Sequence, residues 1–264
     1  MNENKNNFCS FLIKPILCAS LLCLAVAGCD SDEDSDDDLG SIRFYNASTN
    51  APELFLTVDE NLDAEDDDDI EATFSGVGLG ESSGKYELTA QQYYIELAWQ
   101  SEDSSAREDL ELIYQAEHEI VEDAMHFVVI AEDIQAPLVL SYDIAEIDDE
   151  DDIDDQLFNL SLLNLHPFSD GIDIYVSKSD ETFNEAQLLV QLSYTELSDN
   201  QKLEIEEYVF YITAAGSEEV LYQSTDIDYQ YTNQYLLVVR ENPGGGESPF
   251  VIDRVSTSSI ANYE

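Results

Sequence analysis

The chain has 264 residues, and its 59 Asp and Glu residues far outnumber its 9 Lys and Arg residues, which gives a formal net charge of −50 at pH 7. A surface of this charge excludes nucleic acid and bare anionic membrane as partners, because binding either would bring like charges together. Cations, basic proteins and neutral polymers such as glycans stay compatible with it. In the simplest interpretation, the charge serves solubility and adaptation to salt.

The first 29 residues have the features of an export signal. Two lysines lie near the start, an apolar run from Pro15 to Val26 is too short to span a membrane comfortably, and small residues lead into Cys29. The ending Leu-Ala-Val-Ala-Gly-Cys resembles the lipobox of bacterial lipoproteins. This resemblance implies a signal peptide over residues 1–28, cleavage between Gly28 and Cys29, and several acyl chains on Cys29, enough for stable anchoring to a membrane.

An ordinary secretory signal with a chance cysteine and a single membrane helix are the two other interpretations of this segment. The acidic residues from Asp30 to Asp38 end the apolar run abruptly, which argues against a helix that continues past Cys29. Asp30 resembles the residue that retains lipoproteins in the inner membrane of enteric bacteria, a rule that varies between bacterial groups. The sequence therefore predicts the bacterial cell envelope, and leaves open the outer membrane and the periplasmic face of the inner membrane.

The other three cysteines, Cys9, Cys18 and Cys23, fall within the predicted signal peptide. The mature chain of about 235 residues would then have no free thiol and no disulfide, which excludes cysteine nucleophiles and thiolate metal sites. Its stability must come from hydrophobic burial, and its length suits two domains of near-average size. The lipidated cysteine and the acidic run behind it, residues 29–39, predict an extended tether that reaches at most about 35 Å.

Beyond the tether, short segments with a period of two predict β-strands. Examples are Ile42 and Phe44, then Tyr93 to Trp99, where every second residue is large and apolar. The continuous run from Phe127 to Ile130 predicts a more deeply buried strand. The nearest candidate for an amphipathic helix is Asn184 to Leu197, and its alternation suits a strand equally well.

Several of these segments recur in the same order in the second half of the chain, which predicts two copies of one all-β unit of about 100 residues. The matching pairs are 42–46 with 160–164, 54–58 with 172–176, 74–79 with 189–194, 93–97 with 208–212, 126–130 with 235–239 and 137–140 with 249–252. Four glycines between residues 76 and 84 predict a turn or bulge. The second copy has other residues at the first three of those positions, so the fold itself should not require the glycines.

The predicted fold class is therefore all-β, with two tandem immunoglobulin-like antiparallel β-sandwich domains behind the signal peptide and the acidic tether. An acidic segment rich in Asp and Glu separates the two copies and predicts a linker. The predicted boundaries are 40–142 for the first sandwich, 143–156 for the linker, 157–258 for the second sandwich and 259–264 for a C-terminal tail.

The segment Asn-Ala-Ser-Thr-Asn-Ala-Pro-Glu-Leu at residues 46–54 resembles the signature of domain of unknown function 4397, which often occurs in tandem in bacterial surface and exported proteins. The later Phe-Ser-Gly-Val at residues 74–77 and the strand at Tyr93 fit the layout of that family. The second copy is weaker and keeps Asn164. The resemblance implies an immunoglobulin-like sandwich at the cell envelope and no established activity. The residues of the 46–52 loop themselves indicate a structural role, because Asn, Ser and Pro fix turns.

Calcium is the sharpest chemical candidate, because hard cations take clustered carboxylate oxygens. The acidic segment from Asp59 to Glu71 lacks the glycine and the terminal glutamate of an EF-hand loop, so a solvated acidic loop is the favoured interpretation, with a weak calcium site as the alternative. The candidate ligands are Asp59, Asp63, Asp66, Asp67, Asp68 and Asp69.

No arrangement of residues indicates catalysis. His118 and His126 lie eight residues apart near several glutamates, but a useful metal site needs three convergent ligands and two are the most seen here. A Gly-x-Ser-x-Gly elbow does not occur, and paired carboxylates are too common in this chain to indicate a glycosidase. We therefore expect a non-catalytic envelope protein that binds an envelope or extracellular protein or glycan; the alternative is a structural spacer with weak divalent-cation binding.

Overall fold

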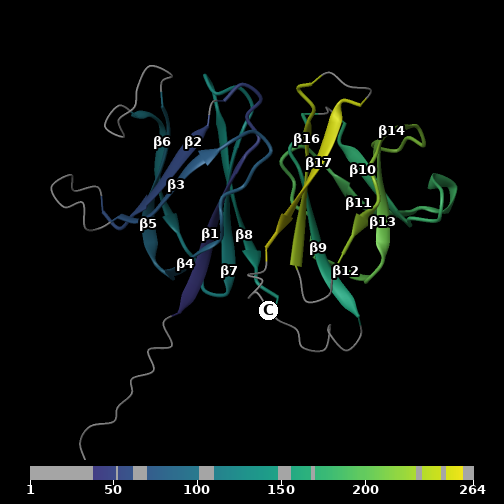
Figure 1. Ribbon diagram of the computed structural model, residues 1–264, viewed down its shortest axis with the longest axis horizontal. Coiled ribbons are helices and arrows are strands. Elements are labelled where there is room, and N and C mark those ends of the chain that lie inside the picture. The colour runs from purple at the N-terminus through teal and green to yellow at the C-terminus, as the bar shows by residue number, and fades with distance from the viewer. Residues whose placement is uncertain are drawn as a thin grey trace, which may run out of the picture. The chain divides into compact units, whose positions relative to one another are not determined.

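The computed structural model describes most of the chain after the predicted tether and is nearly all β-structure (Figure 1). The described residues are 38–51, 53–61, 70–100, 110–147, 156–167, 170–229, 234–244 and 248–257. Within them, the single helical element is a 3-10 turn at Phe183–Glu185, and no helix could cross a membrane. The segment from Asn184 to Leu197 starts within this turn, and its central part, Gln187–Leu192, forms a strand, which the alternation allowed.

The first repeat folds as two four-stranded sheets. One sheet has the strand order β4-β1-β7-β8, and we call it the inner sheet because it faces the second repeat. The other sheet has the order β3-β2-β5-β6, and we call it the outer sheet. The strands are β1 (Leu39–Asn46), β2 (Leu54–Asp59), β3 (Ile70–Val77), β4 (Tyr86–Thr89), β5 (Gln92–Gln100), β6 (Leu110–Glu119), β7 (Ala124–Ala131) and β8 (Leu138–Ala145).

The second repeat has the same arrangement, with an inner sheet β12-β9-β16-β17 and an outer sheet β11-β10-β13-β14 to which the short β15 adds by pairing with β13. The β-sandwich fold class predicted from the repeated strands is confirmed. The strands are β9 (Leu157–Asn164), β10 (Ile172–Lys178), β11 (Gln187–Leu192), β12 (Gln201–Glu204), β13 (Glu207–Ala214), β14 (Val220–Gln223), β15 (Ile227–Asp228), β16 (Gln234–Glu241) and β17 (Phe250–Ser256).

The inner sheets are mixed, which corrects the prediction that all pairing is antiparallel. β1 pairs in parallel with β7, and β9 pairs in parallel with β16. In the first repeat the chain passes from β1 to β2 and β3 of the outer sheet, adds β4 to the inner sheet, and crosses back to β5 and β6 before β7 runs beside β1 in the same direction. The second repeat follows the same path from β9 to β16. A parallel pair requires such a long crossover connection, which the alternation of single segments does not reveal.

β7 and β16 are buried on both faces, and this explains their continuous apolar runs. Val128 and Ile130 point into the core of the first sandwich, whereas Phe127 and Val129 point away from it and are equally buried. In β16, Leu237 faces the core of the second sandwich. The outward-facing residues of both strands must therefore pack against something other than their own outer sheet.

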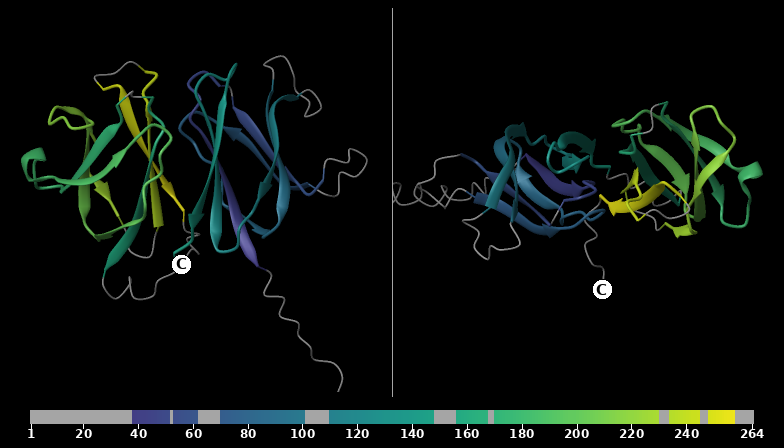
Figure 2. Two further views of the ribbon diagram at one scale, coloured as in Figure 1. Left: turned by 180° about the vertical axis from the view of Figure 1, so that it is seen from behind. Right: turned by 90° about the horizontal axis from the view of Figure 1, so that it is seen from above.

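They pack against each other, and we call this contact between the two inner sheets the seam (Figures 1 and 2). One hydrophobic cluster there unites the two repeats. Its fully buried members include equivalent residues of both repeats: Tyr45 with Leu163, Phe127 with Leu236, and Val129 with Val238. The two sandwiches therefore share a third core, which the pattern of single strands did not predict.

The predicted linker over residues 143–156 starts too early, because its first residues still belong to a strand. β8 runs to Ala145, so Asp143, Ile144 and Ala145 belong to the last strand of the first sandwich, and Ile144 is buried. The acidic composition concealed a strand that faces solvent on one side. Similarly, Leu39, which was assigned to the tether, begins β1. Residues 148–155 of the predicted linker lie outside the described part of the chain.

Candidate functional site between the two repeats

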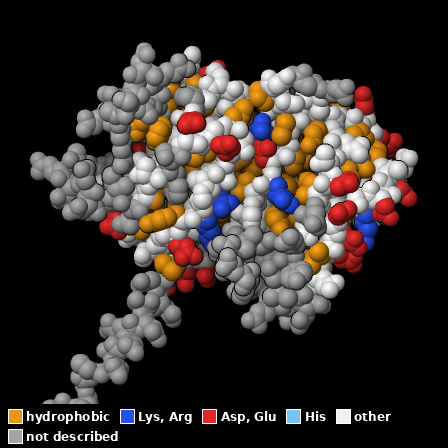
Figure 3. Space-filling model, in the orientation of Figure 1, with side chains coloured by type: hydrophobic (Ala, Val, Ile, Leu, Met, Phe, Trp, Pro, Cys, Tyr) orange, Lys and Arg blue, Asp and Glu red, His pale blue; other side chains and the backbone are white. Residues whose placement is uncertain are grey.

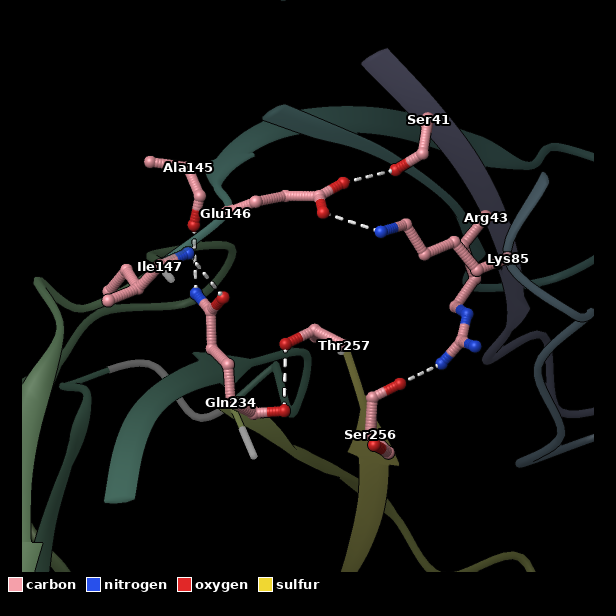
Figure 4. A network of polar contacts seen from close by, with 9 residues as sticks. All are labelled: Ser41, Arg43, Lys85, Ala145, Glu146, Ile147, Gln234, Ser256 and Thr257. Carbon is pink, nitrogen blue, oxygen red and sulfur yellow. Dashed lines mark hydrogen bonds and ion pairs between the residues drawn. The ribbon is translucent and has the colours of Figure 1, made fainter. Parts of the chain in front are cut away.

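Polar contacts flank the hydrophobic seam. Those at one end of the seam form the network drawn in Figure 4. The Gln234 side chain of the second repeat donates to the Ala145 carbonyl at 2.9 Å and accepts from the Ile147 amide at 3.2 Å. Glu146, between them, accepts from the Ser41 hydroxyl at 2.8 Å and pairs with Lys85, whose side chain is only 8% exposed. The segment leaving the first sandwich is thus fixed against both repeats.

The seam also contains a partly buried ion pair. Arg240 pairs with Asp253 of the neighbouring strand at 2.5 Å, and Tyr45 of the first repeat donates its hydroxyl to the same carboxylate at 2.6 Å. Burial, followed by the negative charge of Asp253 and the hydrogen bond to it, raises the pKa of Tyr45 well above its usual value. Desolvated groups in such a triad are stable only while all of them are paired, so the triad favours one register between the inner sheets.

Three of the six described Lys and Arg residues, namely Arg43, Lys85 and Arg240, lie at this boundary. Arg43 donates to the Ser256 carbonyl of the other repeat, and Arg254 lies over the rings of Tyr229 and Tyr235. Arg43, Lys85 and Arg240 compensate charge between two acidic halves, whereas Arg254 lies on the face of β17 that is turned towards the core of the second sandwich. On the face drawn in Figure 3 several Lys and Arg side chains lie near the boundary. Placing scarce positive charge there reduces the repulsion between the sandwiches.

The loop that resembles the family signature is a structural element. Asn46 is fully buried; its side chain donates to the Val77 carbonyl at 3.0 Å and accepts from the Ser48 amide at 3.0 Å. Asn164 makes the same two bonds in the second repeat, to the Leu192 carbonyl and from the His166 amide. The interpretation of this loop as a structural turn is supported by both copies.

A pocket of about 200 Å³ opens at the other end of the seam, and loops of both repeats line it. Its wall is about equally polar and apolar, and it carries three carboxylates, one phenol and one threonine hydroxyl. The lining residues are Ala47, Thr49, Glu132 and Asp133 from the first repeat and Leu165, Pro167, Tyr194 and Glu241 from the second.

Hydrogen bonds across the boundary hold this pocket in shape. The Tyr194 hydroxyl donates to Glu132 Oε1 at 2.8 Å, and the Tyr142 hydroxyl donates to the Thr195 carbonyl at 2.8 Å. Burial, followed by the bond to the Glu132 carboxylate, raises the pKa of Tyr194, so its proton stays in this contact. Glu132 has a φ of 65°, a conformation that costs a non-glycine residue energy and that the Ser48 hydroxyl supports by bonding its carbonyl at 2.7 Å.

Most of the sequence-predicted site residues lie outside the described residues. These are Gly28 and Cys29 of the cleavage site and, from the calcium candidates, Asp63, Asp66, Asp67, Asp68 and Asp69. Asp59 ends β2 and accepts the Asn61 amide at 2.9 Å. Among the described residues, no group of three His, Cys, Asp or Glu is arranged to hold a metal ion.

The pocket was not predicted from the sequence. Its lining comes from five separate loops and strand ends, and no spacing in the chain signals that they converge. The structure does bring together His118 and His126, whose facing ring nitrogens are 3.0 Å apart.

Neither a protein family nor a curated protein matches the chain. Among solved structures, similarities include a candidate cell adhesion protein of Bacteroides eggerthii (8% identity, TM-score 0.27, 83% of this chain and 94% of that chain) and a candidate cell adhesion protein of Parabacteroides distasonis (7%, 0.23, 83% and 98%). A candidate polysaccharide-binding protein of Bacteroides thetaiotaomicron is similar at 10% identity and a TM-score of 0.23, over 83% of this chain and 99% of that chain.

For three further structures the chain spans only 23%, 24% and 25% of their length; one of these is a leucine-rich repeat protein of Bacteroides thetaiotaomicron. TM-scores this low give no basis for transferring a function to this chain.

Proposed function

We propose that this protein is a non-catalytic binding module of the bacterial cell envelope, held to a membrane by lipid on Cys29, and that it binds a glycan at the pocket between the repeats. The observation that carries the proposal is the composite wall of that pocket, to which both repeats contribute across the seam. A site on two packed sandwiches is pre-organised, so little ordering free energy is lost when a ligand binds.

The chemistry of the wall favours a ligand rich in hydroxyl or amine groups. Glu132, Asp133 and Glu241 accept hydrogen bonds, and the aromatic ring of Tyr194 offers an apolar face beside them. A charge of −50 disfavours anionic polymers and leaves neutral or amine-bearing glycans as compatible partners. The volume of about 200 Å³ suits one sugar unit rather than a folded partner.

The test is calorimetric titration of the mature chain, with Cys29→Ser to keep it soluble, against a panel of neutral and amine-bearing oligosaccharides. We expect saturable binding, weakened about tenfold by Tyr194→Phe or Glu132→Gln, since each removes a charge-assisted bond that shapes the pocket. Tyr175→Phe is the matched control, because Tyr175 lies in the outer sheet beside Phe183 and away from the seam. Absence of saturable binding, or equal binding by both Tyr→Phe variants, would contradict the proposal.

The alternative is a structural spacer, which the buried seam also favours because it joins the two sandwiches into one body. The expected weak calcium binding at Asp59 and its acidic neighbours belongs to this alternative. It is tested by thermal unfolding in calcium, magnesium and sodium at matched ionic strength. A calcium-specific rise in the midpoint supports real sites, whereas equal shifts in all three salts indicate only screening of the net charge.

A further inference from the structure

Four side chains form a continuous line of hydrogen bonds across the edge of the first sandwich. The Tyr114 hydroxyl lies 2.9 Å from His118 Nε2, His118 Nδ1 lies 3.0 Å from His126 Nε2, and His126 Nδ1 lies 2.6 Å from Asp143 Oδ1. Tyr114 and His118 are on β6, the edge strand of the outer sheet, whereas His126 and Asp143 are paired residues of β7 and β8 in the inner sheet. The line therefore ties the two sheets together.

The partners determine where each proton lies when both imidazoles are neutral. The Asp143 carboxylate only accepts, so His126 carries its proton on Nδ1 and leaves Nε2 as an acceptor. His118 must then donate from Nδ1 to that acceptor, and its own Nε2 accepts from the Tyr114 hydroxyl. All three bonds point the same way, from the phenol towards the carboxylate.

Because all three bonds point the same way, the line can take up one proton, but not two, without losing a hydrogen bond. One added proton at His118 Nε2 can be accommodated if the Tyr114 hydroxyl turns and the Nδ1 proton moves to His126, whose positive charge then lies beside Asp143. Every hydrogen bond survives this step. A second proton leaves both facing nitrogens as donors with like charge, so the bond between the two imidazoles must break.

Among the described residues, the neighbours of the two histidines along and across their strands add no further imidazole or carboxylate on the same face as the line. On β6 the neighbours Glu117 and Glu119 are exposed on the opposite face of the strand, and the residue paired with His118 across β5 is Tyr93. On the inner sheet, His126 is buried and pairs with Ile42 of β1. Burial, and then the neighbouring His126, lower the pKa of His118, while the Asp143 charge opposes them.

The second repeat shows that the fold does not need this line. The register of its strands places Ile227 at the position of His118, Tyr235 at that of His126 and Ser256 at that of Asp143. These three positions of the second repeat thus carry neither an imidazole nor a carboxylate. The fold of this sandwich therefore does not require the two histidines of the first repeat.

We infer that Tyr114, His118, His126 and Asp143 form a proton-binding relay that makes closure of the outer sheet over the first sandwich sensitive to pH. Between neutral pH and the first protonation, the relay holds β6 against β7 and β8. When the second proton enters, the contact between His118 and His126 is lost and β6 loosens, while the second repeat stays closed.

The first test is a set of long-range ¹H–¹⁵N imidazole spectra of the mature chain (Cys29→Ser) between pH 8 and pH 5. We expect both histidines to carry their proton on Nδ1 at pH 8 and to shift together at the first protonation, whereas His166 of the second repeat titrates separately. A proton on Nε2 of His118, or two histidines that titrate independently, would overturn the relay. This test needs no variant.

The second test is hydrogen exchange of the β6 amides, with β14 of the second repeat as the internal control. From pH 8 to pH 5, after correction for the intrinsic exchange rate, we expect β6 to lose about tenfold more protection than β14. A variant carrying the residues of the second repeat, His118→Ile with His126→Tyr and Asp143→Ser, should remove that difference. An equal loss of protection in β6 and β14 of the unaltered chain would overturn the inference.

Discussion

Gly80 shows most clearly how one residue serves the seam. Its φ is +77°, and a Cβ at this position would lie 2.3 Å from Nη2 of Arg240, which belongs to the other repeat. Its amide also donates to the Asn46 carbonyl at 2.7 Å. The second repeat makes the same bond with Thr195 at a φ of 65°, so a side chain is tolerated there at an energetic cost.

Gly80→Ala should therefore lower the free energy of unfolding by about 1–3 kcal/mol, since it adds strain at positive φ and displaces Arg240. Two glycines separate these causes. Gly216 has a φ of +73° with nothing near its missing Cβ, and Gly84 has open space at an ordinary φ. Urea unfolding should rank the losses Gly80 > Gly216 > Gly84, and a Gly80→Ala variant no worse than Gly216→Ala would contradict the contact with Arg240.

Because of Tyr142, we expect the seam to become less stable at alkaline pH. Burial raises its pKa to about 12, so the folded state keeps its proton longer than the unfolded chain, in which tyrosine titrates near pH 10. The stabilisation is fully present below about pH 10 and is lost as the pH rises towards 12. We expect the urea midpoint to fall over this range, and to fall less steeply in Tyr142→Phe. An identical slope in the two proteins would show that Tyr142 does not contribute.

At the scale of elements, substitutions in β7 test whether both faces of the inner sheet are buried. Val128 points into the sandwich core and Val129 into the seam, and both are fully buried. We expect Val128→Thr and Val129→Thr each to lower the free energy of unfolding by about 1–3 kcal/mol, because each substitution buries a hydroxyl group among apolar side chains. Val121→Thr, at a residue 40% exposed, should change it by less than about 0.5 kcal/mol. A Val129→Thr variant that behaves like Val121→Thr would exclude a buried seam.

The sequence predicted the strands well because period-two alternation and the recurrence of segments are local signals. It also showed that β7 is unusually buried, but the run from Phe127 to Ile130 does not identify what covers its second face. The pocket and the line of hydrogen bonds at His118 and His126 depend on residues from strands that meet only after folding. In β8, the acidic composition around Asp143 was mistaken for a linker because one side of the strand faces solvent.

On the scale of the whole molecule, the seam turns two repeats into a single unit. Equivalent inner sheets meet, a shared hydrophobic cluster fills the contact, and Tyr45 of the first repeat bonds to the partly buried pair of Arg240 and Asp253. Neither half should then unfold without exposing apolar surface of the other. The composite pocket, and with it the proposed glycan site, exists only while this contact holds.

Differential scanning calorimetry of the mature chain tests this claim most directly. If the seam couples the repeats, one transition appears and the calorimetric enthalpy equals the van't Hoff enthalpy. Two resolved transitions, or a calorimetric enthalpy about twice the van't Hoff value, would mean that the sandwiches unfold independently and that the seam does not join them.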